Sequence, residues 1–359
     1  MRQPPDSAVE QIAHATKVVA GPTVLEFEAV AEDQPGPKWQ ALFERFWPAY
    51  ERWFLSQGDQ ERPRYLTSVR ELRKHMPELL PLYEQLVELA GGGDLAARFL
   101  GSFCPPSYLI ACSQAVWHKE QPFLVRNYDY SPQLCECVIL KTAWNGKRVI
   151  AMSDCLWGVL DGINEDGLAL SLSFGGRRTV GTGFGVPLLL RYILEFSSTT
   201  NEAIEVLERV PVHMAYNVTV LDRSGKFVTA YLRPDQPAVI RAVPYAANHQ
   251  EEVEWAQHAQ ATQTLQREQF LFEQLHSHPG KPDDLIPSFL RPPLYSTAFA
   301  QGYGTLYTAV YRPVEGRAEY LWPGGTWQHS FDSFEEGKRI VPLGESIAAQ
   351  GSSSPPRQG

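Results

Sequence analysis

Cys112 and the cluster Arg126-Asn127-Tyr128-Asp129 are the residues of this chain best suited to covalent chemistry. Apolar residues lead into Cys112, and the short apolar stretch 123–125 leads into the cluster. This spacing predicts that Cys112 opens one strand and that the next strand returns a cation and a carboxylate to its side. A free thiol has a pKa of about 8.5, so a nearby cation favours the thiolate that acts as a nucleophile. The alternative is a buried core thiol beside a structural ion pair.

Four segments after Cys112 occur in an order that resembles a known superfamily. They are Arg126-Asn127-Tyr128-Asp129, then Asp161–Leu168 with Leu172-Ser173-Phe174, then Ala246-Ala247-Asn248-His249, and finally Thr264-Leu265-Gln266-Arg267. In this respect the chain resembles the cysteine-type N-terminal-nucleophile (Ntn) hydrolases, in the group of penicillin acyltransferase, choloylglycine hydrolase and acid ceramidase. The resemblance covers roughly residues 35–330 and is strongest over 108–250.

The resemblance implies roles for the residues that match most closely. Cys112 is then the nucleophile, Arg126 and Asp129 assist it, and the side-chain amide of Asn248 binds the oxyanion. Cys112-Ser113 stands where the group usually has Cys-Thr, and this departure keeps the hydroxyl. For Asn248 an alternative stays open, since Asn is a favoured residue at the N-cap of a helix.

Three further residues are candidates for oxyanion or substrate contacts. Ser173 stands where the bile-salt hydrolase branch has an oxyanion-hole Asn, and its side chain has a shorter reach. Arg267 matches a Ser-x-x-Arg segment of the acyltransferase branch and is a candidate contact for transition-state charge or substrate. Asn217 is a candidate substrate contact within a predicted strand. Alternatively, Arg267 is an ordinary charge on a polar helix, and Asn217 is a structural strand residue.

A base is needed to activate the thiol, and the resemblance implies where it comes from. If the bond Ala111–Cys112 is cut, the new α-amino group has a pKa of about 7.7–8.0 and is suited to act as the base. We therefore expect self-cleavage between Ala111 and Cys112. The expected substrate is a small molecule with a linear amide bond, and an acyl thioester is an alternative donor. The acyl group passes through a thioester on the enzyme to water or to an acceptor amine.

Two other functions stay open. One is an uncut cysteine amidase of the same fold, activated by Arg126 alone. The other is a non-catalytic binding scaffold that has lost part of the site.

The composition of the chain limits which binding partners and which cellular compartment we expect. The chain has 359 residues, 43% of them hydrophobic, and a formal net charge of −9. The absence of basic runs argues against nucleic acid or an anionic membrane as a partner. No apolar run is long enough to span a membrane, and the start lacks the apolar region of a signal peptide. We therefore expect a cytoplasmic protein.

The cysteines and histidines predict neither disulfides nor a metal site. The five cysteines are odd in number and scattered in spacing, which argues against a disulfide framework. Cys135-Glu136-Cys137 is expected to alternate across a strand, so that its two thiols face opposite sides. His276-Ser277-His278 lacks a third ligand nearby. We expect no cofactor.

The predicted elements indicate an α+β fold. Apolar residues recur every three or four positions from Trp39 to about Ala97 and predict helices. Beyond Cys112 we expect hairpins over 136–143 with 148–153, 216–221 with 226–231 and 305–311 with 317–322, a strand over 168–174, and helices over 186–196, 203–210 and 251–275. Hairpins dominate, so the sheets should be antiparallel. The resemblance implies a four-layer αββα sandwich of two such sheets, preceded by a helical segment.

Three regions are expected along the chain. They are a helical prelude over 1–111, a catalytic domain over 112–345 and a disordered tail over 346–359. The aromatic stripe from Trp39 to Phe54 requires a partner surface. We therefore expect the cleaved prelude to stay bound, and a homo-oligomer remains an open alternative.

Overall fold

The computed structural model describes residues 23–276 and 282–344. The predicted tail over 346–359 and the pair Ser277-His278 lie outside the described residues. Within these ranges, no helix combines the length and the apolar character needed to cross a membrane.

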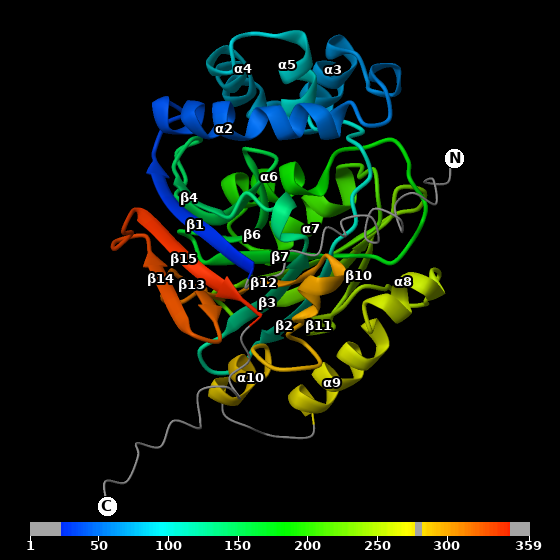
Figure 1. Cartoon of the computed structure of the whole chain (residues 1–359), viewed down its shortest axis with the longest axis vertical. Helices are drawn as coiled ribbons and strands as arrows, with labels where there is room; N and C mark the ends of the chain where they lie inside the picture. The colour runs from blue at the N-terminus through cyan, green and yellow to red at the C-terminus, as the bar shows by residue number, and fades with distance from the viewer. Residues whose placement is uncertain (1–22, 277–281, 345–359) are drawn as a thin grey trace, which may run out of the picture.

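The N-terminal helices confirm the helical pattern read from the sequence. They are α2 (Pro37–Phe54), α3 (Tyr65–His75), α4 (Leu80–Leu89) and α5 (Asp94–Leu100), with short 3-10 turns at Asp59–Glu61 and Pro77–Leu79. Pro37 opens α2, where a proline costs no helical hydrogen bond. On the face of α2, the ring of Phe43 stacks on Trp39 and Trp47, with ring centroids 5.6 and 5.3 Å apart. Figure 1 shows α2 lying along the top of the sheets, beneath the other three helices.

Two sheets form the centre of the molecule. The first sheet contains, in spatial order, β10 (Val239–Arg241), β9 (Phe227–Leu232), β8 (Tyr216–Asp222), β7 (Leu168–Phe174), β6 (Gly158–Asn164), β5 (Val149–Asp154), β4 (Val138–Thr142), β1 (Thr23–Glu32) and β15 (Gly337–Leu343). The second contains β11 (Tyr245–Ala246), β2 (Ala111–Trp117), β3 (Phe123–Tyr130), β12 (Gly304–Arg312), β13 (Arg317–Trp322) and β14 (Gly325–Ser330). Within the described chain, the named strands of these sheets pair antiparallel except β1 and β4, which are parallel.

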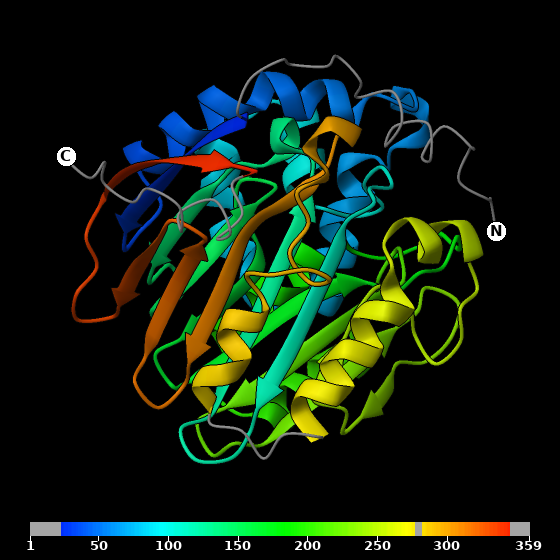
Figure 2. The same cartoon turned by 60° about the horizontal axis from the view of Figure 1, so that its bottom comes forward.

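Helices cover both outer faces of this pair of sheets. The remaining helices are α6 (Val186–Phe196), α7 (Thr200–Arg209), α8 (Ala256–Ala261), α9 (Thr264–His276) and α10 (Pro282–Ser288), with 3-10 turns at Pro132–Leu134 and Ala298–Gln301. Helices α6 and α7 pack on the first sheet, while α9 packs on β2 and β11 of the second sheet (Figure 2). The predicted α+β fold with four αββα layers is confirmed.

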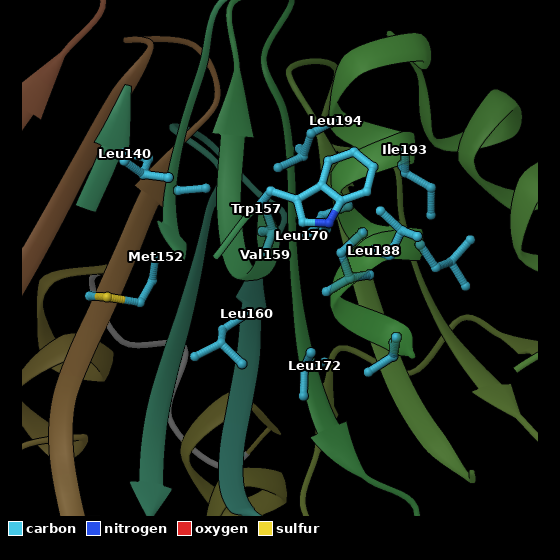
Figure 3. Close-up of a cluster of buried hydrophobic side chains, with 14 of the residues drawn as sticks. Leu140, Met152, Trp157, Val159, Leu160, Leu170, Leu172, Leu188, Ile193 and Leu194 are labelled. Atoms are coloured by element: carbon cyan, nitrogen blue, oxygen red, sulfur yellow. The ribbon is translucent and has the colours of Figure 1, made fainter. Parts of the chain in front are cut away.

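The main hydrophobic core lies on both faces of the first sheet. Figure 3 shows Trp157 and Leu170 of the sheet region facing Leu188 and Ile193 of α6. A second cluster lies on the outer face of the other sheet and joins Ala115, Trp117, Phe123 and Val125 to apolar residues of α9 and α10. Side chains of β2 and β3 therefore alternate between the space between the sheets and the space under α9 and α10.

Three local predictions were wrong or incomplete. The single long helix expected over 251–275 is two helices, α8 and α9, because Gln263 between them adopts a left-handed φ of 52°. The strand expected from Glu136 begins only at Val138, because Cys137 has a φ of 55° and folds its amide back onto the sulfur of Cys135, 3.2 Å away. Strand β1 was not predicted, and it adds part of the prelude to the first sheet. The proposed boundary at residue 111 stays a prediction.

Gly162 of β6 tests how tightly α6 packs on the first sheet. A Cβ at this position would lie 2.6 Å from the Cβ of Ala151 and 2.9 Å from a methyl carbon of Leu194. We expect Gly162→Ala to lower the free energy of unfolding by about 1–3 kcal/mol, the usual cost of overpacking. Gly324→Ala is the matched control, because nothing lies within 4 Å of its added carbon. Equal denaturant midpoints for the two variants would contradict this packing.

Candidate active site

Cys112 lies near the start of β2 and is fully buried. Its strand neighbour is Tyr128 of β3, and its side chain faces the space between the sheets. The sulfur accepts a hydrogen bond from Nη2 of Arg126 at 3.1 Å. The structure therefore brings the predicted nucleophile and the predicted cation together.

Arg126 is held by residues that the sequence reading did not assign to the site. Its Nε donates to the carbonyl of Leu172 at 3.0 Å, and its Nη1 donates to the hydroxyl of Tyr307 at 3.0 Å. The same Nη1 forms an ion pair with Asp161, whose carboxylate also accepts the hydroxyl of Tyr307 at 2.6 Å. The signal in the sequence was the carboxylate of Asp161 among the apolar residues Val159, Leu160 and Ile163 of β6.

Burial raises the pKa of the Cys112 thiol to about 11. Arg126 lowers this pKa both by its charge and by its hydrogen bond, and Asp129 raises it by its negative charge. Burial outweighs the cation because the ionised form loses its hydration. With its backbone intact, Cys112 is therefore a thiol at neutral pH.

Asp129 lies on the opposite face of β3 from Arg126, because the two residues are three apart in a strand. Its carboxylate forms an ion pair with Arg267 of α9 and accepts the hydroxyl of Thr305 at 2.6 Å. Nη1 of Arg267 also lies 3.4 Å from the hydroxyl of Ser113. The structure thus brings Arg267 to the residue next to Cys112, as part of a second buried ion pair.

Asn248 clamps the backbone of Cys112. Its Oδ1 accepts the Cys112 N–H at 2.8 Å, and its Nδ2 donates to the Cys112 carbonyl at 3.0 Å. The amide thus takes the place of a paired strand beyond β11, which runs next to β2 up to the pair Ala246 and Gln114. The backbone N–H of Asn248 donates to Thr264 Oγ1 at 2.6 Å, which ties the clamp to the start of α9. The N-cap alternative does not hold, because α8 begins only at Ala256.

Ser173 and Asn217 form hydrogen bonds with the segment that carries Asn248. The Ser173 hydroxyl donates to the Ala247 carbonyl at 2.6 Å. The Asn217 side chain donates to the carbonyls of Ala247 and His249 at 3.0 and 2.9 Å. Both side chains therefore hold the segment that carries Asn248, rather than facing Cys112.

A largely apolar cavity of about 320 Å³ lies against Ala111, the residue before Cys112. Helix α2 supplies part of its wall through Phe46, Tyr50 and Trp53. The residues that precede the bond Ala111–Cys112, from Ser107 to Ala111, supply another part. Helix α2 and the segment before Cys112 thus form part of the wall of the cavity.

Two buried carboxylates meet at this cavity. The hydroxyl of Tyr50 from α2 contacts Glu136 and lies 3.4 Å from the carboxylate of Asp154, and Ser153 donates to Glu136 at 2.7 Å. Burial, reinforced by the charge of Glu136, raises the pKa of Asp154 from its ordinary value of 3.8 to about 7. Burial also raises the pKa of Glu136. No Lys or Arg of the described ranges forms an ion pair with either carboxylate.

The fold and this site define a class: an αββα sandwich with a buried cysteine and arginine between its sheets. The model of the acyl-coenzyme A:6-aminopenicillanic acid acyl-transferase family matches residues 116–327. The match begins just after Cys112 and takes in Arg126, Asp129, Asn248 and Arg267. The chain belongs to this family, and the predicted relationship to the Ntn hydrolases is confirmed. A comparison with curated proteins finds none that matches.

Solved structures with a distant likeness to this chain include amide hydrolases. A mutant conjugated bile acid hydrolase from Clostridium perfringens shares 10% identity over 66% of this chain and 98% of its own, with a TM-score of 0.43. An N-acylethanolamine-hydrolyzing acid amidase ortholog from Caenorhabditis elegans shares 16% over 64% and 100%, with a TM-score of 0.45. Penicillin V acylase from Agrobacterium tumefaciens shares 14% over 62% and 86%, with a TM-score of 0.42. The assignment of the chain comes from the family model.

The raised pKa of Asp154 predicts a pH dependence of stability. Between about pH 3.8 and about pH 7, the folded protein holds a proton on Asp154 that the unfolded chain has released. The stabilisation from this proton is therefore full below about pH 3.8 and is lost as the pH rises through about 7. We expect the unfolding temperature of the wild type to fall more between about pH 5 and about pH 8 than that of Asp154→Asn, measured by calorimetry. Asp332→Asn, at an exposed position, should keep the wild-type slope. Parallel slopes for wild type and Asp154→Asn would contradict the shift.

Proposed function

We propose that the chain is a cysteine Ntn amidase or acyltransferase that acts on linear amides through a thioester on Cys112. One observation carries the proposal. The sulfur of Cys112 contacts Arg126, while the backbone N–H of the same residue is held by Asn248. A core thiol needs neither contact, whereas an N-terminal nucleophile needs both its sulfur and its backbone nitrogen positioned. Membership of an acyltransferase family supports the same chemistry.

The first step is cleavage of the bond Ala111–Cys112. The Cys112 thiol gives up its proton and its sulfur attacks the Ala111 carbonyl carbon, which forms a thioester as the C–N bond breaks. The nitrogen takes up the proton that the thiol has released and becomes the α-amino group of Cys112. Water then hydrolyses the thioester, which leaves a carboxylate on Ala111 and restores the thiol. The Arg126 hydrogen bond stabilises the sulfur as it loses its proton.

The second step is turnover of an amide by the new N-terminus. Asn248 Oδ1 now accepts a hydrogen bond from the Cys112 nitrogen and would orient the free amine toward the sulfur. The amine takes the thiol proton, the sulfur attacks the substrate carbonyl, and the amine passes the proton to the leaving nitrogen. Once the Cys112 backbone adjusts, Asn248 Nδ2 is the donor for the oxyanion. Water or an acceptor amine then takes the acyl group.

The cavity against Ala111 is the site for the acyl group. Its largely apolar wall suits an aromatic or alkyl chain, and cleavage frees the segment over 107–111 that borders it. Because Phe46, Tyr50 and Trp53 form part of the wall, we expect the prelude to stay bound after cleavage. Asp129 and Arg267, as a second ion pair, fix the backbone beside the nucleophile. Cytoplasmic location and the oligomeric state stay predictions.

Cys112→Ala tests the function directly. We expect this variant to remain a single chain and to lose turnover of every N-acyl amide in a panel with aromatic and alkyl acyl groups. Cys104→Ala, which changes a half-buried thiol outside the site, should give two fragments that meet at Ala111 and Cys112 and should keep turnover. Intact mass under denaturing conditions reads the cleavage. Amide turnover by folded Cys112→Ala would contradict the proposal.

Asn248→Ala tests the clamp. This change removes both side-chain hydrogen bonds to Cys112 and the donor for the oxyanion, so we expect turnover to fall by about 100- to 1000-fold. Asn201→Ala, on the exposed face of α7, is the matched control and should leave turnover unchanged. The measurement is kcat for the best amide of the panel. A loss smaller than about tenfold would exclude Asn248 as the oxyanion donor.

A further inference from the structure

The guanidinium of Arg126 has its hydrogen-bonding directions fixed by three strands. Nε is bonded to the carbonyl of Leu172 in β7, Nη1 is bonded to Asp161 of β6 and Tyr307 of β12, and Nη2 is bonded to the Cys112 sulfur. Burial lowers the pKa of Arg126, while the neighbouring Cys112, Tyr307 and Asp161 raise it, with a large net rise. Arg126 is therefore a permanent cation inside the sandwich.

Asp161 is the only carboxylate that forms an ion pair with Arg126 in the described part of the chain. Its two oxygens also accept the hydroxyls of Tyr307, at 2.6 Å, and Tyr311. Tyr311 in turn lies 3.1 Å from the hydroxyl of Tyr320. All of these side chains are fully buried. Asp161 does not line the cavity and forms no hydrogen bond with Cys112.

Burial raises the pKa of the Cys112 thiol, and the charge balance of this group determines how far Arg126 offsets that rise. An isolated cation beside a thiol would strongly favour the thiolate. Here the carboxylate of Asp161 neutralises the cation on the side away from Cys112. The sulfur therefore accepts a hydrogen bond from an N–H whose direction is fixed. This donor belongs to the Arg126–Asp161 ion pair, whose net charge is close to zero.

We propose that Asp161, held by Tyr307 and Tyr311, is the positioning residue that aims Arg126 at Cys112 and keeps the nucleophile a thiol until a base removes its proton. The inference rests on the proposed function, in which the α-amino group of Cys112 is that base. Asp161 lies on the other sheet from Cys112 and does not line the cavity. The thiol form suits turnover, which begins with one proton transfer from the sulfur to the α-amino group.

Asp161→Asn separates positioning from structural support. The change keeps the shape of the side chain and removes its charge, so the thiolate of Cys112 becomes the remaining anionic partner for Arg126. We expect the pKa of Cys112 to fall by about one to three units. The readout is the Cβ chemical shift of Cys112 in protein labelled with ¹³C-cysteine, titrated by NMR and assigned by its loss in Cys112→Ala. An unchanged pKa in folded Asp161→Asn would overturn the proposal.

Two hydroxyl deletions provide the second test if Asp161→Asn does not fold. Tyr307→Phe removes a donor to Asp161 and an acceptor for Arg126, and it should also change the titration of Cys112. Tyr320→Phe is the matched control, because its hydroxyl contacts Tyr311 and not Asp161. A Tyr307→Phe titration that coincides with those of Tyr320→Phe and the wild type would overturn the positioning role.

Kinetics give a further readout where turnover exists. Asp161→Asn should lower kcat by at least about tenfold and leave KM nearly unchanged, because Asp161 acts on Arg126 and not on the cavity. A selective rise in KM would contradict the positioning role. The NMR titration needs neither self-cleavage nor a substrate, so it remains decisive even if the proposed function fails.

Discussion

The buried ion pair between Arg126 and Asp161 is the interaction on which the rest of this structure depends. Arg126 belongs to the second sheet and Asp161 to the first, so the pair joins the two sheets through the centre of the sandwich. A buried charge without a partner is strongly destabilising. The two sheets are therefore held in one relative position, and this position puts the Arg126 donor against the sulfur of Cys112.

Successive side chains of β3 point to opposite faces of the sheet, so Arg126 and Asp129 have different partners. Arg126 faces the space between the sheets and controls the sulfur, whereas Asp129 faces α9 and pairs with Arg267. Between these two ion pairs runs the backbone of Cys112, which Asn248 clamps from the neighbouring edge. Cys112 is therefore held at its sulfur, its amide nitrogen and its carbonyl, and the apolar cavity borders the preceding residue, Ala111.

Much of the fold could be predicted because the signals are local. The strand over 168–174 and the helix over 186–196 have the predicted bounds. Apolar residues recur at every second position of a strand and at every third or fourth position of a helix, so both signals can be read locally. The hairpin at Asn145-Gly146 formed as its turn chemistry required. The prediction of a single long helix over 251–275 was wrong, because the left-handed conformation of Gln263 does not change the spacing of the apolar residues.

The site was only partly predictable, for a different reason. Cys112, Arg126 and Asn248 lie in segments whose order carried the resemblance, and the structure places them in contact. The partnership of Arg126 with Asp161 joins strands of different sheets, and no sequence spacing encodes it. The same holds for β1, which pairs with β4 and β15 far along the chain.

The role of Cys112 is tested by the mass of the denatured protein after brief incubation with an excess of an N-acyl amide substrate and an acid quench. We expect two fragments, and we expect the fragment that begins at Cys112 to gain the mass of one acyl group. Peptide mapping should place this group on the Cys112 sulfur. An uncut chain, or an acyl group on any other residue, would contradict the central claim that Cys112 is an N-terminal nucleophile.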